Sequence, residues 1–398
     1  MDLFEKCAGL IREYRDEPAR VAMFYRPVDP IDGRHGLCGF RRVLMLGSND
    51  YLGVTHHPRV KAAVIDAVGR FGSSSCGARL NNGTTSLHER LEERLAAMKG
   101  VESVVVFSNG FLAMLGTLTS LLADGDVVFC DQENHASLVD GCRLSAAETR
   151  VFRHADVDHL AGMLGEYGPE VGKLIVVDGV FSQSGRIAPL PQLVELARRH
   201  GARLMVDDAH ASGVLGPSGH GTADHFGLAG RVDLVAGTFS KALGSVGGFV
   251  GSTREVADYL RFRCRAHLFT AAPPVAVVAA VLAVLDVLED EPERREAMWR
   301  NARRLRGDLA AAGFDVGDSE TPITPVILGD PRHTLQAAAR LEAAGFFVNP
   351  ILPPAVPRRG ARLRVTPTAA HTEEDLASFV DALVEVRRAV GIPEHVAG

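Results

Sequence analysis

The sequence predicts an α/β protein with a large domain around a mostly parallel sheet of seven strands and a smaller C-terminal α+β domain. Short β-branched runs alternate with helical stretches between residues 43 and 251, which is typical of a parallel sheet covered by helices. After Pro273-Pro274 the pattern changes to long helices rich in Ala, Val, Leu and Arg, followed by short strands. With 398 residues, 46% of them hydrophobic, the chain has enough apolar material for more than one core.

Seven short apolar runs are the expected strands of the large domain. Helices expected at 58–70 and 86–98 separate some of them, and the second presents Leu87, Leu91 and Leu95 on one face. Helices of this kind bury the two faces of a parallel sheet. The expected strands are 43–46, 104–107, 127–130, 174–177, 204–206, 234–236 and 249–250.

The C-terminal part of the chain is expected to add three short strands and a closing helix that begins at about Glu373. Its apolar run at 275–285 predicts a buried helix, because about 20 residues are needed to cross a bilayer, and we expect no membrane span. The strands lie near 326–328, 346–348 and 363–365. The expected division is an N-terminal arm at 1–45, a large domain at 46–275 and a small domain at 276–398.

The composition argues against several classes of protein. The 43 basic and 49 acidic residues give a net charge of -6 without long runs of one sign, so no nucleic-acid partner is expected. The first residues lack a basic segment followed by an apolar one, which predicts a cytoplasmic protein. The six cysteines contain no C-x-x-C pair and fit neither a disulfide framework nor a zinc site.

One lysine stands out among the five in the sequence. Lys241 follows an expected strand and lies in a loop of small and hydroxyl residues, Gly-Thr-Phe-Ser-Lys-Ala-Leu-Gly, which is suited to holding a phosphate beside an amine. An uncharged lysine amine is a nucleophile toward aldehydes, as chemistry with pyridoxal 5'-phosphate (PLP) requires. The other four are expected at ordinary structural positions, on polar helix faces (Lys6, Lys61), at a helix end (Lys99) and at a strand start (Lys173).

An acidic residue occupies the matching position on another strand. The run 204–206 ends in Asp207-Asp208-Ala209-His210, at the carboxyl end of a strand, where open α/β sheets bind ligands. PLP chemistry also needs an acid facing the pyridinium nitrogen, and Asp207 is the candidate. On the residues alone, a strand-terminal Asp equally serves to cap the next turn.

Two other types of site are not supported by the sequence. His210, His220 and His225 lack the ligand spacing of a zinc site, so we expect no metal. The glycines between 244 and 251 do not form G-x-G-x-x-G, the fingerprint of a dinucleotide site.

Several motifs in a fixed order make the sequence resemble the α-oxoamine synthase family of PLP enzymes. They run from Ser-Asn-Asp-Tyr-Leu-Gly at 48–53, through Phe-Ser-Asn-Gly-Phe at 107–111 and Thr-Phe-Ser-Lys at 238–241, to Arg-Leu-Arg-Val-Thr at 362–366, nearly the whole chain. The resemblance implies the fold-type-I fold, like that of aspartate aminotransferase, with PLP as cofactor. Subfamily signals conflict, because 83–85 resembles aminolevulinate synthases whereas 238–241 and 246–249 resemble serine palmitoyltransferases.

The resemblance implies a role for each matching residue at the cofactor. Lys241 carries PLP as a Schiff base, Asp207 faces the pyridinium nitrogen, and His135 stacks on the ring. Ser182 and His210 lie near the ring hydroxyl. Without the resemblance, the turn at 107–111 also fits an ordinary strand-to-helix turn, and His135 fits a helix cap or a core residue. The phosphate is held by Asn109, Gly110, Phe111 and Thr238, and by Thr270 of the neighbouring subunit, so the resemblance implies a homodimer with shared active sites.

The implied reaction is the decarboxylative condensation of a small amino acid (glycine, alanine or serine) with an acyl thioester of CoA or of an acyl carrier protein. It yields an α-amino ketone, carbon dioxide and a free thiol. Lys241 removes the α-proton, and His135 helps to polarise the thioester carbonyl. Asn49, Thr85 and Arg364 match substrate-binding positions, although Arg364 also reads as a surface arginine of a strand. The alternatives are acyl transfer to glycine without a required decarboxylation, transamination, and a non-catalytic scaffold subunit.

Overall fold

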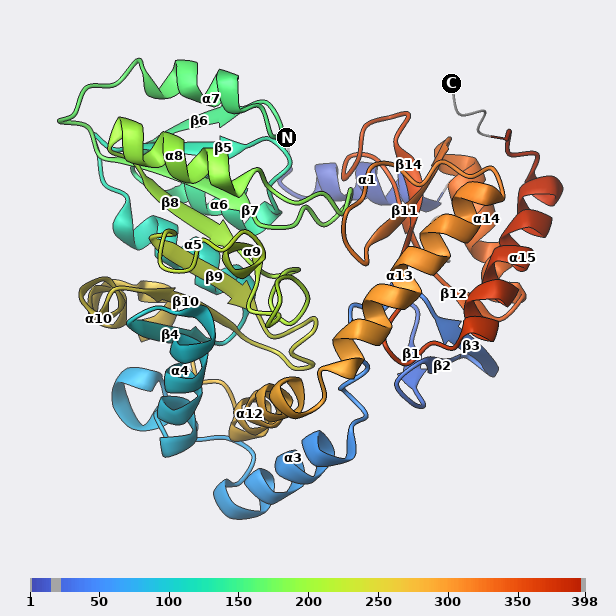
Figure 1. The fold of residues 1–398 in the computed structure, drawn as a ribbon, viewed down its shortest axis with the longest axis horizontal. Coiled ribbons are helices and arrows are strands. Elements are labelled where there is room, and N and C mark those ends of the chain that lie inside the picture. The colour runs from blue at the N-terminus through green and yellow to red at the C-terminus, as the bar shows by residue number, and fades with distance from the viewer. Residues whose placement is uncertain (1, 16–22, 395–398) are drawn as a thin grey trace. The chain divides into compact units, whose positions relative to one another are not determined.

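The computed structural model describes residues 2–15 and 23–394, which form two compact units coloured along the chain in Figure 1. The large unit comprises Asn49–Ser182 and Arg186–Glu296. The small unit comprises the described chain up to Ser48, the short segment Gln183–Gly185 and the chain from Ala297 onward. This division differs from the expected one, because 276–296 belongs to the large unit and the N-terminal segment to the small one.

The large unit is built on a seven-stranded sheet, which confirms the predicted fold class. Its β10 pairs antiparallel with β4 and β9, and all other neighbours are parallel. Five of the strands are buried along their whole length, as expected for a sheet covered on both faces. The order is β4 (Ser103–Phe107), β10 (Gly248–Ser252), β9 (Leu234–Thr238), β8 (Arg203–Asp207), β7 (Lys173–Asp178), β5 (Val127–Asp131) and β6 (Glu148–Phe152).

The prediction of one strand of this sheet is wrong. The run at 43–46 lies in β3 (Arg41–Met45), which belongs to the small unit, and the seventh strand is β6. β6 is an edge strand with mostly exposed or half-buried side chains, and only Phe152 is buried. Its sequence Glu-Thr-Arg-Val-Phe therefore lacks the apolar run by which the other strands are identified.

Helices cover both faces of the sheet (Figure 1). On one face, α5 (Gly110–Leu121), α6 (Ala136–Leu144) and α10 (Arg254–Arg263) share a core with the sheet. On the other, α7 (Val157–Leu164) and α8 (Leu190–His200) do so. The remaining helical elements of the large unit are α3 (Pro58–Phe71), a π-helical turn (Arg79–Gly83), α4 (Ser86–Lys99), α9 (Thr222–His225), α11 (Arg265–Leu268) and α12 (Val275–Asp290).

The predicted buried helix is α12, which packs against α3 and α4. No helix within residues 2–15 and 23–394 is long and apolar enough to cross a membrane.

The small unit contains two short sheets around one apolar core. The first joins β1 (Val28–Pro30), β2 (His35–Cys38) and β3 to β12 (Phe346–Phe347), and the second has the order β11 (Thr324–Gly329), β14 (Ala361–Val365), β13 (Asn349–Ile351). The segment expected to be an N-terminal arm thus supplies three strands, of which only β3 overlaps an expected run; residues 1 and 16–22 lie outside the described part. Its helices are α1 (Glu5–Arg15), α13 (Glu293–Ala311, which starts in the large unit), α14 (Pro331–Ala343) and α15 (Glu373–Val390).

Candidate active site

A cavity of about 260 Å³ lies in the large unit at the carboxyl ends of the parallel strands. Ligand sites of open α/β sheets lie at this edge because loops of several strands meet there. The cavity is small beside the roughly 300–1,000 Å³ typical of drug-sized ligands, and suits a compact cofactor. The predicted residues among its lining are Asn109, Gly110, Phe111, His135, Ser182, Asp207, His210, Thr238 and Lys241.

Lys241 reaches the cavity from the loop that follows β9. Thr238 ends that strand, and its hydroxyl donates a hydrogen bond to the carbonyl of Gly247 at 2.9 Å. The same Oγ1 lies 3.0 Å from Oγ of Ser240. The loop is thus held across its base while its hydroxyls and the lysine face the cavity. Ser240 belongs to the motif but was not singled out as a site residue.

The N-terminus of α5 lines the same cavity beside this loop. Asn109 caps this helix, its Oδ1 accepting a hydrogen bond from the backbone N–H of Leu112 at 2.8 Å. A Cβ at Gly110 would lie 2.8 Å from Cβ of Thr238, so only glycine permits this approach of the two elements. The first N–H groups of a helix have no intrahelical acceptor and favour an anion. The turn at 107–111 therefore places such donors beside the Thr238 hydroxyl.

Two carboxyl groups line the cavity from neighbouring strands. Asp207 ends β8, and Asp178 ends β7 directly beside it in the sheet register. Burial raises the pKa of Asp207 to about 6. Burial and the neighbouring Asp207 raise the pKa of Asp178 well above its usual range. Oδ1 of Asp178 is buried without a hydrogen-bond partner in the described chain, and such a costly group points to a bound ligand.

Asp178 was missed at the sequence level. Its signal is the same as that of Asp207, an acidic residue directly after a buried β-branched run, here Lys-Leu-Ile-Val-Val-Asp.

His135 caps α6 and also lines the cavity, so both interpretations of this residue hold. Its Nδ1 accepts a hydrogen bond from the backbone N–H of Ser137 at 3.3 Å, so the neutral ring carries its proton on Nε2. Its own backbone N–H donates to Oδ2 of Asp178 at 3.1 Å. Burial, followed by the charge of Lys241, lowers its pKa, so the ring is neutral at pH 7.

His210 is anchored by a residue that the sequence did not single out. The hydroxyl of Tyr51 lies 2.7 Å from Nδ1 of His210, and the two rings meet edge to face. Tyr51 is almost completely buried and belongs to the motif at 48–53. Its hydroxyl therefore fixes the orientation of the imidazole at the cavity wall.

Four predicted residues are not in the lining of this cavity. Thr85 caps α4, where its hydroxyl lies 2.9 Å from Nδ1 of His88. Asn49 and Thr270 are half-buried in the large unit. Arg364 lies in β14 of the small unit and is only 5% exposed, so its interpretation as a surface arginine is wrong.

Known proteins resemble the chain along almost its whole length. Residues 41–383 match the family model of class I and II aminotransferases. An 8-amino-7-oxononanoate synthase of Symbiobacterium thermophilum is 45% identical over 388 residues, 97% of this chain and 96% of that protein. A serine palmitoyltransferase of Sphingobacterium spiritivorum is 40% identical, covering 91% of each chain. The chain belongs to the α-oxoamine synthase family.

A solved structure of this family supports the cofactor. It is a serine palmitoyltransferase from S. paucimobilis with a bound PLP–myriocin aldimine, 36% identical, with a TM-score of 0.94 over 99% of this chain and 100% of that one. The predicted enzyme class, cofactor and reaction are thereby confirmed. This α-oxoamine synthase uses PLP to condense an amino acid with an acyl thioester, with loss of carbon dioxide.

The cavity of this α-oxoamine synthase fits PLP in its chemistry. The helix N-terminus and the hydroxyls of Thr238 and Ser240 suit a phosphate, and Lys241 supplies an amine for the aldehyde. The buried carboxyls of Asp178 and Asp207 suit a cationic ring nitrogen.

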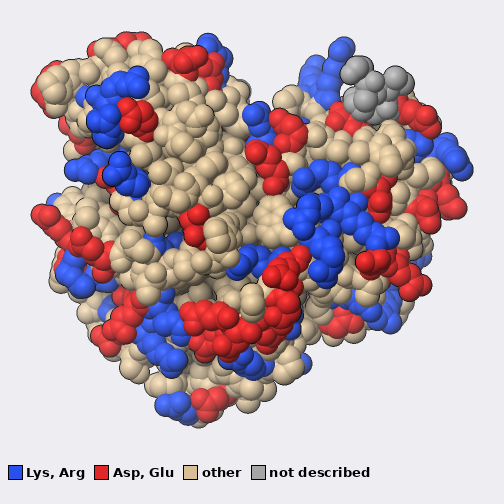
Figure 2. Space-filling view, viewed as in Figure 1, with Lys and Arg blue, Asp and Glu red and all other residues tan. Residues whose placement is uncertain are grey.

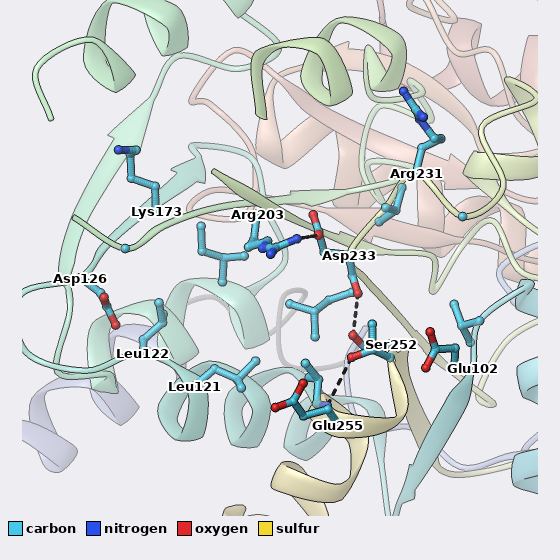
Figure 3. A pocket seen from close by; sticks show the side chains of 18 of the residues that line it. Glu102, Leu121, Leu122, Asp126, Lys173, Arg203, Arg231, Asp233, Ser252 and Glu255 are labelled. Atoms are coloured by element: carbon cyan, nitrogen blue, oxygen red, sulfur yellow. Dashed lines mark hydrogen bonds and ion pairs between the residues drawn. The ribbon is translucent and has the colours of Figure 1, made fainter. Parts of the chain in front are cut away.

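A larger cavity, about 620 Å³, lies at the opposite edge of the same sheet, where the parallel strands begin (Figure 3). Its charged side chains largely satisfy one another or the backbone. Arg203 pairs with Asp233 at 2.7 Å, and Nζ of Lys173 donates to the carbonyl of Gly168 at 2.6 Å. Figure 2 shows the same intermingling of acidic and basic side chains over the visible face of the large unit.

Proposed function

We propose that this α-oxoamine synthase joins glycine, alanine or serine to an acyl thioester of CoA or of an acyl carrier protein, at the cavity of the carboxyl edge. The observation that carries the proposal is the convergence of an amine, buried carboxyls and a helix N-terminus on that one cavity. The products are an α-amino ketone, carbon dioxide and the free thiol.

We assign the covalent and proton-transfer roles to Lys241. When bound, PLP withdraws the electrons left on the α-carbon of the amino acid. Nζ of Lys241 binds the cofactor's aldehyde and, after the amino acid has displaced it, takes the α-proton and later returns a proton. Its place in the cavity lining and its influence on the pKa of His135 support this role.

Asp207 is assigned to hold a proton on the ring nitrogen of the cofactor. Its Oδ1 accepts a hydrogen bond from the backbone N–H of Ala209 at 2.9 Å, which fixes the carboxyl at the end of β8. Asp178 adds a second acidic group next to it. Two adjacent buried acids stabilise a cationic group beside them, because a buried carboxylate is unfavourable without a positive partner.

The neutral ring of His135 is assigned to pack against the face of the cofactor. Its Nε2–H is then available to donate a hydrogen bond to the thioester carbonyl as negative charge develops there. Ser182 and His210, the latter held by Tyr51, are assigned to the ring hydroxyl. The N-terminus of α5 and the hydroxyls of Thr238 and Ser240 are assigned to the phosphate.

Substrate binding and assembly complete the proposal. We assign the substrate carboxylate to Asn49, Thr85 and Arg364, since a guanidinium binds a carboxylate through two hydrogen bonds. Thr270 is assigned to the phosphate of the neighbouring subunit, in a homodimer. The adjacent Phe269 is 73% exposed, as expected of a residue that a partner subunit covers. A cytoplasmic location is part of the same proposal.

The test is a visible spectrum of the PLP-loaded protein titrated separately with glycine, alanine and serine, followed by product analysis with acyl-CoA substrates. We expect one amino acid to shift the cofactor band. With that amino acid and an acyl-CoA, we expect carbon dioxide and free thiol to be released in equal amounts. Thiol release without carbon dioxide would replace the proposal by simple acyl transfer. No spectral change with any of the three would favour a scaffold subunit.

A further inference from the structure

A buried ion pair lies directly behind the cavity wall. Nζ of Lys99, the last residue of α4, is 2.9 Å from Oδ2 of Asp208, and the two side chains are 1% and 2% exposed. The same Nζ donates to the carbonyl of His220 at 2.5 Å. The sequence assigned Lys99 an ordinary position at a helix end, so its burial is a correction that only the tertiary structure supplies.

The surroundings are shaped around this pair. Oδ1 of Asp208 accepts a hydrogen bond from the hydroxyl of Thr222 at 2.7 Å. Gly221 has a φ of +119°, and a Cβ there would lie 1.9 Å from Oδ2 of Asp208 and 2.7 Å from Nζ of Lys99. A Cβ at Gly179 would lie 2.7 Å from Oδ1 of Asp208. Glycines on two separate segments thus leave the space that the ion pair fills.

Asp208 of this ion pair lies in the same turn as Asp207, the acid that faces the cavity. Asp207 and Asp208 are consecutive, so one side chain lines the cavity while the other lies among Lys99 and Thr222 behind it. Removing one partner of a buried ion pair leaves an uncompensated charge in a medium of low dielectric constant. When Lys99 is removed, that charge lies on Asp208, the immediate neighbour of Asp207 in the chain.

Charged groups from several elements act on Asp207. The negative charge of Asp208 raises its pKa, whereas the positive charges of Lys241 and Lys99 lower it. Asp178 faces it from β7, and the charge of Asp207 raises the pKa of Asp178. His210 follows on the same turn. Of the two lysines, only Lys99 lies outside the cavity lining.

We propose that Lys99 is a positioning residue of the cofactor site, which neutralises Asp208 and thereby leaves Asp207 ionised toward the ring nitrogen of PLP. The proposal rests on the proposed placement of Asp207. Lys99 touches neither cofactor nor substrate in this role; it acts through the 207–210 turn. An isolated Asp208 carboxylate would favour protonation of Asp207, and an isolated Lys99 ammonium would favour its ionisation.

The test is the pH dependence of PLP affinity, measured by equilibrium dialysis between pH 5 and 8. Wild-type affinity falls on acidification as Asp207 takes up a proton. Lys99→Met is expected to move the midpoint of this fall upward by about one pH unit, and Asp208→Asn to move it downward by a similar amount. The double variant K99M/D208N is expected to return to the wild-type midpoint. The cofactor's own titrations are common to all variants and cancel in the comparison.

Midpoint shifts of opposite sign in the two single variants would show that the charges act on Asp207, because the loss of a purely structural ion pair does not move the midpoint. Equal weakening of PLP binding at every pH in both single variants, or shifts of the same sign, would overturn the proposal. If K99M does not fold, D208N is compared with the double variant, and identical midpoints in those two would overturn it.

Two controls keep the result specific. Lys173→Met removes another buried lysine of the same unit, whose Nζ donates to the carbonyl of Gly168 and which is 6% exposed as a whole residue against 7% for Lys99. It is expected to leave the midpoint unchanged, and a shift in K173M as large as in K99M would overturn the proposal. Asp207→Asn tests the premise separately. If D207N binds PLP as tightly as the wild type and loses affinity on acidification in the same way, the proposed placement of Asp207 is overturned rather than the role of Lys99.

Discussion

The two edges of the seven-stranded sheet carry cavities of opposite character. The cavity at the amino edge is the larger, about 620 Å³ against about 260 Å³, and is lined by numerous charged side chains. Apart from the buried Lys173, those charges are exposed or half-buried, and they pair locally, as Arg203 does with Asp233. At the carboxyl edge, Asp207 and Asp178 are buried side by side, and a third buried acid, Asp208, pairs with Lys99 behind the cavity wall.

The difference shows that buried and unbalanced charge, rather than volume, marks the reactive site. Exposed ion pairs contribute little free energy and impose little on their surroundings. Adjacent buried carboxyls are unfavourable in the protein alone, and they persist because they serve a ligand. Substitutions at the carboxyl edge should therefore trade activity against stability, whereas those at the amino edge should affect neither greatly.

The largest effect is expected for Lys241→Ala. Loss of the amine removes both the attachment of PLP and the base for the α-proton, so turnover should fall by at least about 10³-fold. The measurement is the rate of thiol release from an acyl-CoA under saturating amino acid. Lys173→Met at the amino edge is the matched control and should keep wild-type turnover. An equal loss of turnover in both variants would contradict the proposed difference between the two edges.

Asp207→Asn should reduce both PLP affinity and turnover by about 10²-fold, because a neutral amide does not hold the proton on the ring nitrogen. The pKa of Asp207 is raised to about 6, so the carboxylate predominates at pH 7 and is lost as the pH falls through 6. Wild-type affinity should therefore drop between pH 7 and 5, while D207N stays low and flat. An unchanged acid limb in D207N would contradict the assignment.

Asp178→Asn should stabilise the PLP-free protein at neutral pH. Burial and Asp207 raise the pKa of Asp178 in the folded state above its value in the unfolded chain. The carboxyl therefore destabilises the folded protein at pH values above the unfolded pKa, and this cost disappears below it. We expect the free energy of unfolding to rise by about 1–2 kcal/mol at pH 8, with the gain vanishing toward pH 4. Urea unfolding at both pH values measures it. A gain of equal size at pH 4 would show that charge is not its cause.

The smallest effect is expected at the amino edge. Arg203 is 77% exposed, and its pair with Asp233 is screened by solvent. Arg203→Ala should change the free energy of unfolding by less than about 0.5 kcal/mol and leave turnover unchanged. The same urea and thiol-release assays apply. A large loss of turnover in R203A would reveal a function at the larger cavity and break the comparison.

The sequence predicted the sheet where strands are buried and apolar, and failed where they are not. The runs at 104–107, 127–130 and 204–206 form β-strands at the expected places. β6 was missed because an edge strand with an exposed face carries no apolar run. The run at 43–46 looks like a sheet strand but pairs with β2 and β12, and such long-range pairing is not encoded in local periodicity.

The sequence brought together those site residues that carry a local motif. Lys241 and Asp207 were candidates from their places after buried strands and His135 from the family resemblance, and all three line one cavity. Asp178 has the same pattern and was overlooked. The burial of Lys99 was out of reach, because a lysine at a helix end is exposed or buried according to what tertiary packing brings to it.

The central claim is that PLP binds at the carboxyl edge through Lys241. The direct measurement is borohydride reduction of the PLP-loaded protein, followed by digestion and mass spectrometry of the pyridoxyl-labelled peptide. The chain has five lysines, at 6, 61, 99, 173 and 241, so the label identifies the site uniquely. We predict stoichiometric label on Lys241 alone. Label on Lys173, in the lining of the amino-edge cavity, or on Lys99 would contradict the claim.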